Sequence, residues 1–527
     1  MNQSVDLIVI GGGATGAGIA LDAALRGLSV TLFEQNDFGE GTSSRSTKLV
    51  HGGVRYLEAA VKHLDLEQWK LVREGLRERK MFLRNATHLA HPIELITPLY
   101  KWYELPYVYA GLFLYDLISG RATLGRSRLL SAKTALKRNS AIDPDHLKGA
   151  VSYFDGAFND ARMVIALIQS AEAAGAHVYN HHAVTELVKD PEGRITGVRV
   201  HDTLAGTDTQ YAATAVINAT GPFTDTIRHL DDPDAPPLVE TSSGIHIVLP
   251  ARFLPSPLGV MIPKTSDGRL LFALPYQGHC LVGTTDQPAA LDEHPPVTGE
   301  EVDFLLEHLN HYFALKANRD DILATFSGLR PLIASGAHGS TATLVRESEY
   351  ITSPSGLLTV AGGKWTSYRA MAEKAIDRIL AAHPDLTQTH PCTTADTPVI
   401  GSRASRKVVM KQLADQGLAR QAEHLYAHYG DQSVFIEHHA RSPDDLKPLL
   451  SDPPITRAEI RYTIQKEYVR KPLDFLVRRS GLGLVEREKA LTLLPEVLEL
   501  MNEELSWNRV SRKSMENEAK QLLSTSI

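Results

Sequence analysis

Cysteine is scarce in this chain of 527 residues, which holds only two, Cys280 and Cys392. No C-x-x-C pair occurs, so a disulfide framework, a zinc ribbon and a redox dithiol have no support in the sequence. Each thiol is predicted to be a small buried side chain rather than a nucleophile. Long apolar runs are also missing, because no stretch reaches the roughly 18 residues of a membrane span. The nearest, residues 107–118, is shorter and contains Asp116.

An excess of one charge sign is lacking as well. The 55 basic and 62 acidic residues leave a net charge of -7, which gives no global reason to expect binding to nucleic acid or to an acidic lipid surface. The N-terminus has neither a basic segment nor a signal cleavage site, so the sequence predicts a cytoplasmic protein without a secretory signal. Apolar residues make up 43% of the chain, and its length predicts more than one domain.

What the chain does have is a glycine turn at its beginning. Residues 7–10 are apolar and predict a buried strand, which runs into the pattern Gly11-x-Gly13-x-x-Gly16. A helix is expected to follow from about Ala14, with its first N–H groups directed at a diphosphate. A second apolar strand, residues 30–33, ends at Glu34, where a carboxylate would hold ribose hydroxyls and repel a 2′-phosphate. The combination predicts a dinucleotide that is not of the NADP type.

Two later segments are predicted to return to the same ligand. A strand over 211–217 runs into Asn-Ala-Thr-Gly-Pro, residues 218–222, and beside the N-terminal motif this ending favours a flavin nucleotide over a nicotinamide one. A strand over 356–361 is followed by Gly362-Gly363-Lys364 and by a helix over about 365–381. This is a second glycine turn at a helix N-terminus.

The remaining segments predict a large α/β fold with insertions. The loop 39–56 is dense in Gly, Ser and Thr; such a run suits a plain surface loop, and its hydroxyls and amides also suit a wrap around a ligand. Residues 95–117, rich in aromatic side chains and interrupted by Pro98 and Pro106, are interpreted as a core-facing helical hairpin in preference to a membrane-docking face. Helices are expected over 64–83 and 160–174, an antiparallel sheet over 241–290, and mostly helical structure beyond 390.

Seven motifs spread over the chain belong together: GGGATG (11–16), TSSRSTKLVHGGVRYLE (42–58), ATGP (219–222), GTTD (283–286), SGLRPL (327–332), GGKWTSYR (362–369) and YVRKPLDFLVRRSGLG (468–483). In this combination the chain resembles the FAD-dependent glycerol-3-phosphate dehydrogenases, and more broadly the D-amino-acid-oxidase-like flavoproteins. One departure is SSGIH, residues 242–246, where many relatives carry a lysine two or three places before the histidine. The extra internal stretch of the soluble oxidase relatives is absent, which favours the quinone-linked dehydrogenases.

The resemblance implies an α/β fold in which a Rossmann-like FAD-binding domain carries an inserted antiparallel-sheet substrate domain and a C-terminal helical cap domain. The first 390 residues would hold the FAD-binding domain (about 1–90, 150–240 and 325–390) interleaved with the substrate domain (about 91–149 and 241–324). Residues 391–527 would form the helical domain. The expected FAD contacts are Gly11, Gly13, Ala14, Thr15, Gly16, Glu34, Thr42, Ser43, Ser44, Lys48, Leu49, Thr220, Gly221, Gly363, Lys364, Trp365 and Thr366.

The resemblance also implies the oxidation of sn-glycerol 3-phosphate to dihydroxyacetone phosphate, with a hydride passing from carbon to flavin N5. A phosphate monoester requires cations, and arginine presents its donors as a fork that suits phosphate. By family match the cations are Arg55, Arg330, Arg346 and Lys364, with Arg330 and Lys364 in the catalytic set. His51 and His246 are the expected proton acceptors, since imidazole titrates nearest neutrality. Tyr56 and Thr284 are predicted to hydrogen-bond the substrate.

The implied partner is a membrane quinone, reached by reversible peripheral attachment to the inner face of the cell membrane. No metal or nucleic acid is expected, and a homodimer is compatible with the sequence. Two other interpretations stay open: a flavin oxidase that reduces oxygen, acting on the same phosphate or on an amino acid, and a non-enzymatic FAD-bound scaffold. The sequence does not decide the electron acceptor, the identity of the proton acceptor, the oligomeric state or the lipid preference.

Overall fold

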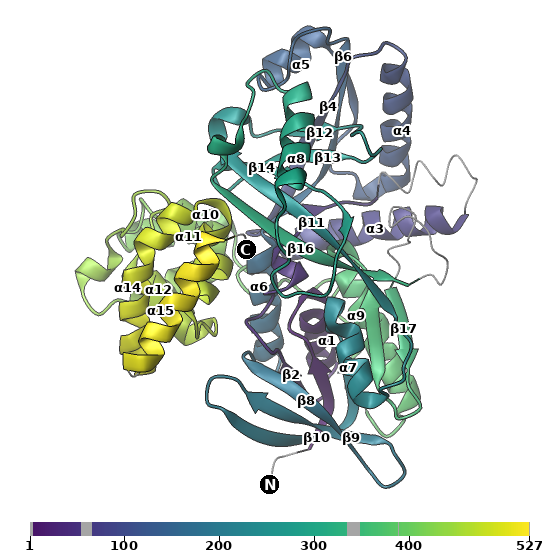
Figure 1. Ribbon diagram of the computed structural model, residues 1–527, viewed down its shortest axis with the longest axis vertical. Coiled ribbons are helices and arrows are strands. Elements are labelled where there is room, and N and C mark those ends of the chain that lie inside the picture. The colour runs from purple at the N-terminus through teal and green to yellow at the C-terminus, as the bar shows by residue number, and fades with distance from the viewer. Residues whose placement is uncertain (1–3, 54–65, 335–347, 388, 508, 526–527) are drawn as a thin grey trace.

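A computed structural model describes residues 4–53, 66–334, 348–387, 389–507 and 509–525. In this part of the chain two sheets lie one above the other, and a lobe of helices from the C-terminal part packs beside them (Figure 1). The chain passes between the two sheets several times, so that segments far apart in the sequence meet where the sheets adjoin.

The first sheet is built around the N-terminal strand. Strand β1 (Val5–Ile10) lies parallel to β2 (Val30–Phe33) on one side and to β10 (Thr207–Asn218) on the other. All four apolar residues of β1 from Leu7 onward are buried, because Leu7 and Val9 face one helix layer while Ile8 and Ile10 face the opposite side. A strand covered on both faces is expected to read as a continuous apolar run. The order is β17-β18-β10-β1-β2-β7, with β9 beside β10 and β8 beside β9; the further strands are β7 (His177–Tyr179), β8 (His182–Lys189), β9 (Ile195–Asp202), β17 (Ser348–Thr352) and β18 (Leu358–Gly362).

Three helices cover one face of this sheet and confirm the predicted helical segments. Helix α1 (Ala14–Leu25) follows the glycine turn, and small residues on it allow close packing against α6 (Asp160–Ala173) and α9 (Tyr368–Ala382). The side chain of Asn159 begins α6 by accepting a hydrogen bond from the backbone N–H of Arg162, as an N-cap does. Helix α7 (Thr224–Asp231) packs on the other face.

The second sheet is mostly antiparallel, as the alternating pattern over 241–290 predicts. Strand β11 (Val239–Pro250) pairs with β14 (His279–Gly283) and with β16 (Ala324–Ile333). Helix α8 (Gly299–Tyr312), begun by a capping box of Thr298 and Glu301, lies against it. The remaining strands are β3 (Leu49–Val50), β4 (Ala90–Leu99), β5 (Arg128–Ser131), β6 (Gly149–Phe158), β12 (Gly259–Ile262), β13 (Leu271–Tyr276) and β15 (Gln287–Pro288), in the order β15-β11-β14-β13-β12-β4-β6-β3 with β5 beside β6.

The helical hairpin predicted for residues 95–117 is wrong in its first half. Strand β4 runs to Leu99 and pairs with β6 over its whole length, and α4 (Glu104–Ser119) begins only afterwards. A short apolar run does not distinguish a buried strand from a helix by periodicity, and here the cross-strand pairing decides. The core-facing interpretation of α4 holds for one side only: Leu105, Leu112 and Tyr115 are buried, whereas Tyr107, Phe113 and Leu117 are exposed.

The C-terminal lobe is helical, as expected, and is tied to the first sheet by buried ion pairs. Arg162 of α6 makes two hydrogen bonds of 2.5 and 2.7 Å with the carboxylate of Glu467. Arg478 and Arg479 both pair with Asp37, in the loop after β2. The lobe comprises α10 (Arg406–Asp415), α11 (Ala422–Tyr429), α12 (Arg457–Lys466), a π-helical turn (Asp474–Arg479), α13 (Leu482–Val485), α14 (Arg487–Leu505) and α15 (Arg509–Ser524).

Candidate active site

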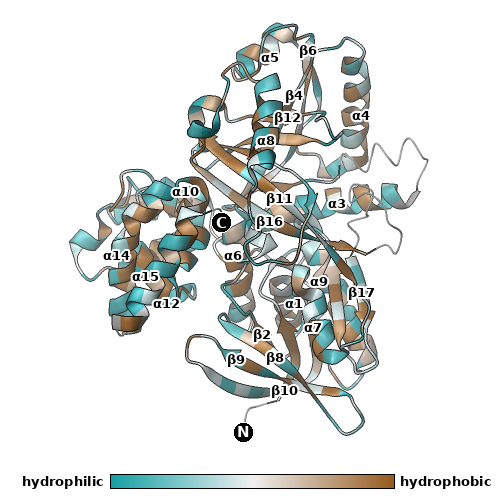
Figure 2. Ribbon diagram, in the orientation of Figure 1, coloured by the Kyte–Doolittle hydropathy of each residue, from teal (hydrophilic) through white to brown (hydrophobic). Residues whose placement is uncertain are grey.

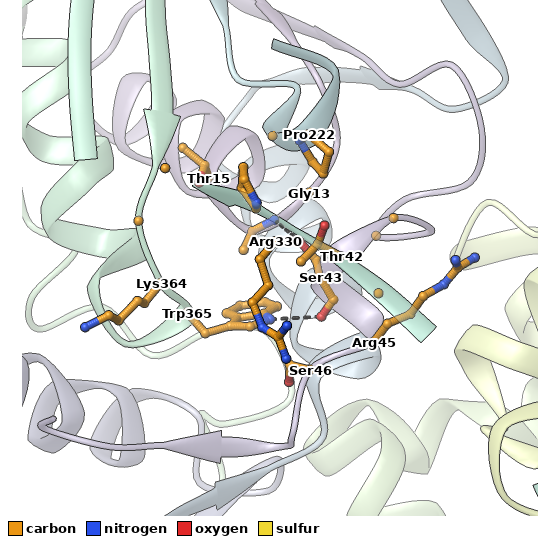
Figure 3. Close-up of a pocket in the computed structure, with 18 of the residues that line it drawn as sticks. Gly13, Thr15, Thr42, Ser43, Arg45, Ser46, Pro222, Arg330, Lys364 and Trp365 are labelled. Carbon is orange, nitrogen blue, oxygen red and sulfur yellow. Dashed lines mark hydrogen bonds between the residues drawn. The ribbon is translucent and has the colours of Figure 1, made fainter. Parts of the chain in front are cut away.

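A cavity of about 710 Å³ lies where the two sheets adjoin. Its lining comes from the carboxyl ends of β1, β2, β10 and β18 in the first sheet, and from β11 and β16 in the second. Segments from four distant parts of the sequence therefore share one cavity, and Figure 3 shows several of their side chains pointing into it. In an α/β sheet the crevice beyond the carboxyl ends of the strands is where ligands bind.

The glycine turn after β1 forms one wall. Gly11 has a φ of 107°, and a Cβ there would lie 2.6 Å from the backbone oxygen of Ala219, so only glycine fits. A Cβ on Gly16 would lie 1.9 Å from the Gly11 oxygen; Gly16 thus serves the packing of α1 on the turn and lies outside the lining. Gly13, Ala14 and Thr15 line the cavity at the start of α1. Such a turn leaves room for a diphosphate at the helix N-terminus.

Glu34 stands where a ribose would be held. Its carboxylate accepts hydrogen bonds from the backbone N–H groups of Gly12 (2.6 Å) and Asn36 (3.0 Å). Burial raises the pKa of Glu34 to about 7, even though these two amide hydrogen bonds lower it. An oxygen acceptor at the end of the second strand suits the adenosine ribose of a dinucleotide.

The pKa of Glu34 predicts pH-dependent uptake of FAD by flavin-stripped protein. Ribose hydroxyls donate to the carboxylate, so FAD binding favours the ionised form, and affinity should rise by up to about tenfold between about pH 6 and pH 8. Fluorescence titration with FAD measures this. The Glu34→Gln variant should bind more weakly and show no such dependence; an unchanged slope in that variant would assign the titration to another group.

The segment after β2 wraps over the helix start. Ser43 Oγ accepts a hydrogen bond from the Ala14 N–H (3.0 Å), and the Ser43 backbone oxygen accepts one from Trp365 Nε1 (2.9 Å), which Figure 3 draws as a dashed line. Thr42 Oγ1 donates to the Leu329 oxygen (2.5 Å). The described part of the loop 39–56 therefore joins the first glycine turn, the second one and β16.

Two predicted FAD contacts in this segment, Ser44 and Lys48, lie outside the lining. Ser44 is buried, and its backbone oxygen accepts a hydrogen bond from Lys48 Nζ (2.6 Å). Lys48 has a φ of 62°, and its ammonium pairs with Asp160 Oδ1 at 2.6 Å inside the protein. Leu49, the next residue, does line the cavity. The motif alone does not show that the Lys48 side chain turns inward, because its pairing partner is distant in sequence.

The two returning segments line the cavity as predicted. After β10 the lining includes Thr220, Gly221 and Pro222; after β18 it includes Gly363, Lys364, Trp365 and Thr366. Gly362 and Gly363 have φ values of 74° and 88°, which glycine adopts at little cost. Strand β10 lies beside β1, and β18 lies beside β10, so both segments end at the same edge of the sheet as the glycine turn.

The second sheet contributes a fixed arginine. Arg330 on β16 donates from Nη1 to the Ser243 oxygen (3.1 Å) and to Asp286 Oδ1 (3.1 Å). Its Nη2 donates to Thr284 Oγ1 (3.0 Å) and to the Thr285 oxygen (2.9 Å). Arg330 and Thr284, both predicted as site residues, are thus in direct contact.

The sequence motifs do not mark two residues of this part of the cavity, Arg269 and Asp286, as site residues. Arg269 lines the cavity and lies 3.3 Å from Asp286 Oδ2, so Asp286 is shared by two arginines. Asp286 was visible in GTTD, but only strand pairing brings it to Arg269 and Arg330. Arg55, Tyr56 and Arg346 lie outside the described residues.

The two candidate histidines, His51 and His246, both line the cavity but have different hydrogen-bond partners. The Nδ1 atom of His51 accepts a hydrogen bond from the Gly53 N–H (3.2 Å), so a neutral ring carries its proton on Nε2. His246 stacks on Phe326, and its Nε2 lies 3.0 Å from Thr47 Oγ1. Burial, with help from Lys48 and Arg330, holds the pKa of His246 well below its usual value. His246 is therefore neutral near pH 7.

A cluster of Asp37, His181 and Asp474 has donor atoms close enough to hold a metal ion. Both carboxylates are already committed, Asp37 to Arg478 and Arg479 and Asp474 to Arg478. An added cation would face these guanidinium groups, so we assign the cluster to docking of the lobe.

Comparison with known proteins agrees with this geometry. Residues 6–375 match the family model of FAD dependent oxidoreductases, and residues 392–512 match that of the C-terminal domain of alpha-glycerophosphate oxidase. The chain is 40% identical over 532 residues to the mitochondrial glycerol-3-phosphate dehydrogenase of Homo sapiens, covering 98% of this chain and 73% of that protein. It is 38% identical over 545 residues to the Arabidopsis thaliana enzyme, covering 99% and 86%.

A solved structure is also similar over nearly the full length. The glycerol-3-phosphate dehydrogenase of Bacillus halodurans, in complex with FAD, superimposes with a TM-score of 0.81 at 31% identity, covering 99% of this chain and 95% of that one. The FAD-bound L-alpha-glycerophosphate oxidase of Mycoplasma pneumoniae shares the fold, with a TM-score of 0.57 at 17% identity over 75% of this chain and 98% of that one. The glycine cradle and the acceptor at Glu34 fit the same dinucleotide. This chain belongs to the FAD-dependent glycerol-3-phosphate dehydrogenase family.

Proposed function

We propose that the chain oxidises sn-glycerol 3-phosphate to dihydroxyacetone phosphate and passes the electrons to a membrane quinone. The observation that carries the proposal is that Arg330 and Arg269 line the same cavity as the glycine turn. The names of the relatives supply the substrate class. FAD, when bound, supplies the hydride acceptor that side chains lack.

The arginine wall, formed by Arg330 and Arg269 with Asp286 between them, suits a phosphate monoester. Asp286 lies between Arg330 and Arg269, and Asp267 also pairs with Arg269 (3.4 Å), so these four charges balance. The hydrogen bonds that Arg330 donates fix its guanidinium before the substrate arrives. A preorganised cation in a sheltered cavity binds an anion without reorganisation of the site. Lys364, which follows β18 of the first sheet, also lines the cavity.

His51 is our choice for the proton acceptor. Its backbone oxygen accepts a hydrogen bond from Thr366 Oγ1 (3.2 Å), so the residue is anchored to the segment after β18. To take a proton on Nε2, a neutral ring must carry its own proton on Nδ1 and give up the Gly53 contact. His246 has a strongly lowered pKa, so we assign it to orienting the substrate.

Helix α4 supports peripheral attachment to a membrane. Five large side chains just before and along this helix have exposed fractions between 54% and 69%: Trp102, Tyr103, Tyr107, Phe113 and Leu117. Figure 2 shows hydrophobic residues along the helix at the edge of the molecule. Large apolar and aromatic side chains gathered on one surface mark an interaction site. Among the described residues, no helix combines the length and apolar character needed to cross a bilayer.

A basic groove of about 510 Å³ lies at the C-terminal end of α4. Arg73, Arg77, Lys80 and Arg84, spaced along α3 (Leu66–Asn85) by four, three and four residues, line it with Arg121. Asp396 also lines the groove and pairs with Arg84. The like charges of Arg73, Arg77 and Lys80 repel one another at this spacing, and an anionic surface would relieve the repulsion. We therefore propose that the aromatic face of α4 and this groove rest on anionic phospholipid.

The double variant Phe113→Ser, Leu117→Ser is expected to lose membrane binding. Each substitution removes an apolar side chain whose full burial is worth roughly 1.5–3 kcal/mol. The partition coefficient of the protein onto vesicles of zwitterionic and anionic phospholipid should therefore fall at least tenfold. Vesicle flotation measures it, with Leu204→Ser, Leu291→Ser as the matched control on other surfaces. Equal flotation of both double variants would remove α4 from the membrane contact, and a wild type that high salt fails to release would contradict reversible attachment.

The competing activities are separated by turnover with different acceptors and substrates. The proposal predicts rapid reduction of a quinone analogue with glycerol 3-phosphate, little hydrogen peroxide in air, and no turnover with amino acids. Stoichiometric peroxide would instead support the oxidase. Bound FAD that no substrate reduces would support a scaffold, which has no use for the cations of the arginine wall.

A further inference from the structure

Three buried polar side chains meet beside the peptide that follows His51: Arg79 of α3, Tyr115 of α4 and Asp155 of β6. Each is at most 2% exposed. Only Asp155 lines the cavity. Nothing in the proposed reaction uses these groups directly, and burying three of them together requires that their hydrogen bonds be satisfied.

Their hydrogen bonds lead to the backbone beside His51. Tyr115 Oη donates to Asp155 Oδ1 (3.0 Å) and accepts from the Gly52 N–H (2.8 Å). Arg79 Nη1 donates to the same Asp155 oxygen (2.6 Å). Burial and the nearby Asp155 carboxylate raise the pKa of Tyr115 well above its usual value, so the phenol keeps its proton.

Packing brings this backbone directly against both helices. A Cβ on Gly52 would lie 2.5 Å from Leu76 Cδ2 and 2.7 Å from Tyr115 Oη. A Cβ on Gly75 of α3 would lie 3.2 Å from the Gly52 oxygen. Only glycine allows such a close approach at residue 52. The contacts with Leu76 and Tyr115 therefore restrict the position of the peptide between His51 and Gly52.

We propose that Tyr115 is a positioning residue for His51. The Tyr115 hydroxyl holds the Gly52 amide from one side, Thr366 holds the His51 carbonyl from the other, and Asp155 with Arg79 fixes the direction of the hydroxyl. The inference rests on the proposed role of His51. The hydrogen bond between Tyr115 and Gly52 also connects the active site to α4. On the same helix, Phe113 and Leu117 are exposed.

The test is the Tyr115→Phe variant, which keeps the packed ring and removes one oxygen. We expect full FAD content, a kcat lower by about tenfold or more because the histidine is misplaced, and a KM for glycerol 3-phosphate changed less than about threefold because the arginine wall is intact. The pKa of the basic group in the pH profile of kcat/KM should also move. Tyr100→Phe is the matched control, since the Tyr100 hydroxyl donates to the Asp143 oxygen (3.0 Å) away from the cavity.

A double-mutant cycle separates positioning from general stability. In a His51→Gln background, Tyr115→Phe should lower kcat less than about twofold, because its effect runs through the histidine. An equal loss in both backgrounds, or an unshifted pH profile, would overturn the proposal. If Tyr115→Phe loses its flavin, Asp155→Asn must show the same loss of kcat for the proposal to stand. A wild type that leaves glycerol 3-phosphate unoxidised would instead refute the proposed function.

Discussion

The Gly13→Val variant is expected to purify without flavin. Gly13 precedes α1, and a Cβ there would lie 3.0 Å from Ser43 Oγ, the atom that accepts the Ala14 N–H. The methyl groups of valine would fill the space in front of the helix N-terminus, where the diphosphate of FAD belongs (Figure 3). We expect less than about one flavin per ten chains, measured as visible flavin absorbance against protein absorbance.

The matched control places the same side chain where the structure has room. A Cβ on Gly111 of α4 meets no atom within 4 Å, so Gly111→Val should keep its flavin. Circular dichroism of both variants checks that the fold is retained. A Gly13→Val protein that stays fully yellow would mean that the dinucleotide lies elsewhere.

The second large effect is expected from Arg330→Ala. This change removes the cation best fixed in the cavity, and losing a charged hydrogen-bonded contact to an anion costs roughly 2–5 kcal/mol. The value of kcat/KM for glycerol 3-phosphate should therefore fall by about 30-fold to several thousandfold. Flavin content should not change, because Arg330 lies on the second sheet.

Glycerol distinguishes phosphate binding from a general defect. It lacks the phosphate, so its slow oxidation should be equally slow in wild type and in Arg330→Ala. Arg319→Ala, which removes an exposed ion pair with Asp303, should behave as wild type, because such pairs contribute little. Equal losses with glycerol and glycerol 3-phosphate would show that Arg330 supports the fold rather than the substrate.

Most of the residues predicted to contact FAD line the cavity, because the signals for this half of the site are local. A turn that admits only glycine, an acid at the end of the next strand and a second glycine turn are each set by neighbouring residues. Parallel pairing of β2 with β1, of β1 with β10 and of β10 with β18 brings them together. The C-terminal helices follow from periodicity for the same reason. The domain boundaries drawn from the sequence stay a prediction.

The substrate half is less predictable because its contacts cross strands. Asp286 meets Arg330 through the pairing of β11 with β14 and β16, and it meets Arg269 through the pairing of β13 with β14. No single sequence motif encodes these contacts. Lys48 turns inward to Asp160, 112 residues away in sequence. The local pattern of residues 95–99 predicts a helix, whereas pairing with β6 makes them part of strand β4. The roles of Arg55, Tyr56 and Arg346 stay predictions.

If the chain oxidises glycerol 3-phosphate, FAD and the arginine wall must serve one substrate in one cavity. The most direct measurement is the absorbance spectrum of the purified protein without oxygen, before and after glycerol 3-phosphate is added. We predict that the visible flavin band bleaches with glycerol 3-phosphate, persists with an equal concentration of glycerol, and returns when a quinone analogue is added. A flavin band that glycerol 3-phosphate leaves unchanged would contradict the account.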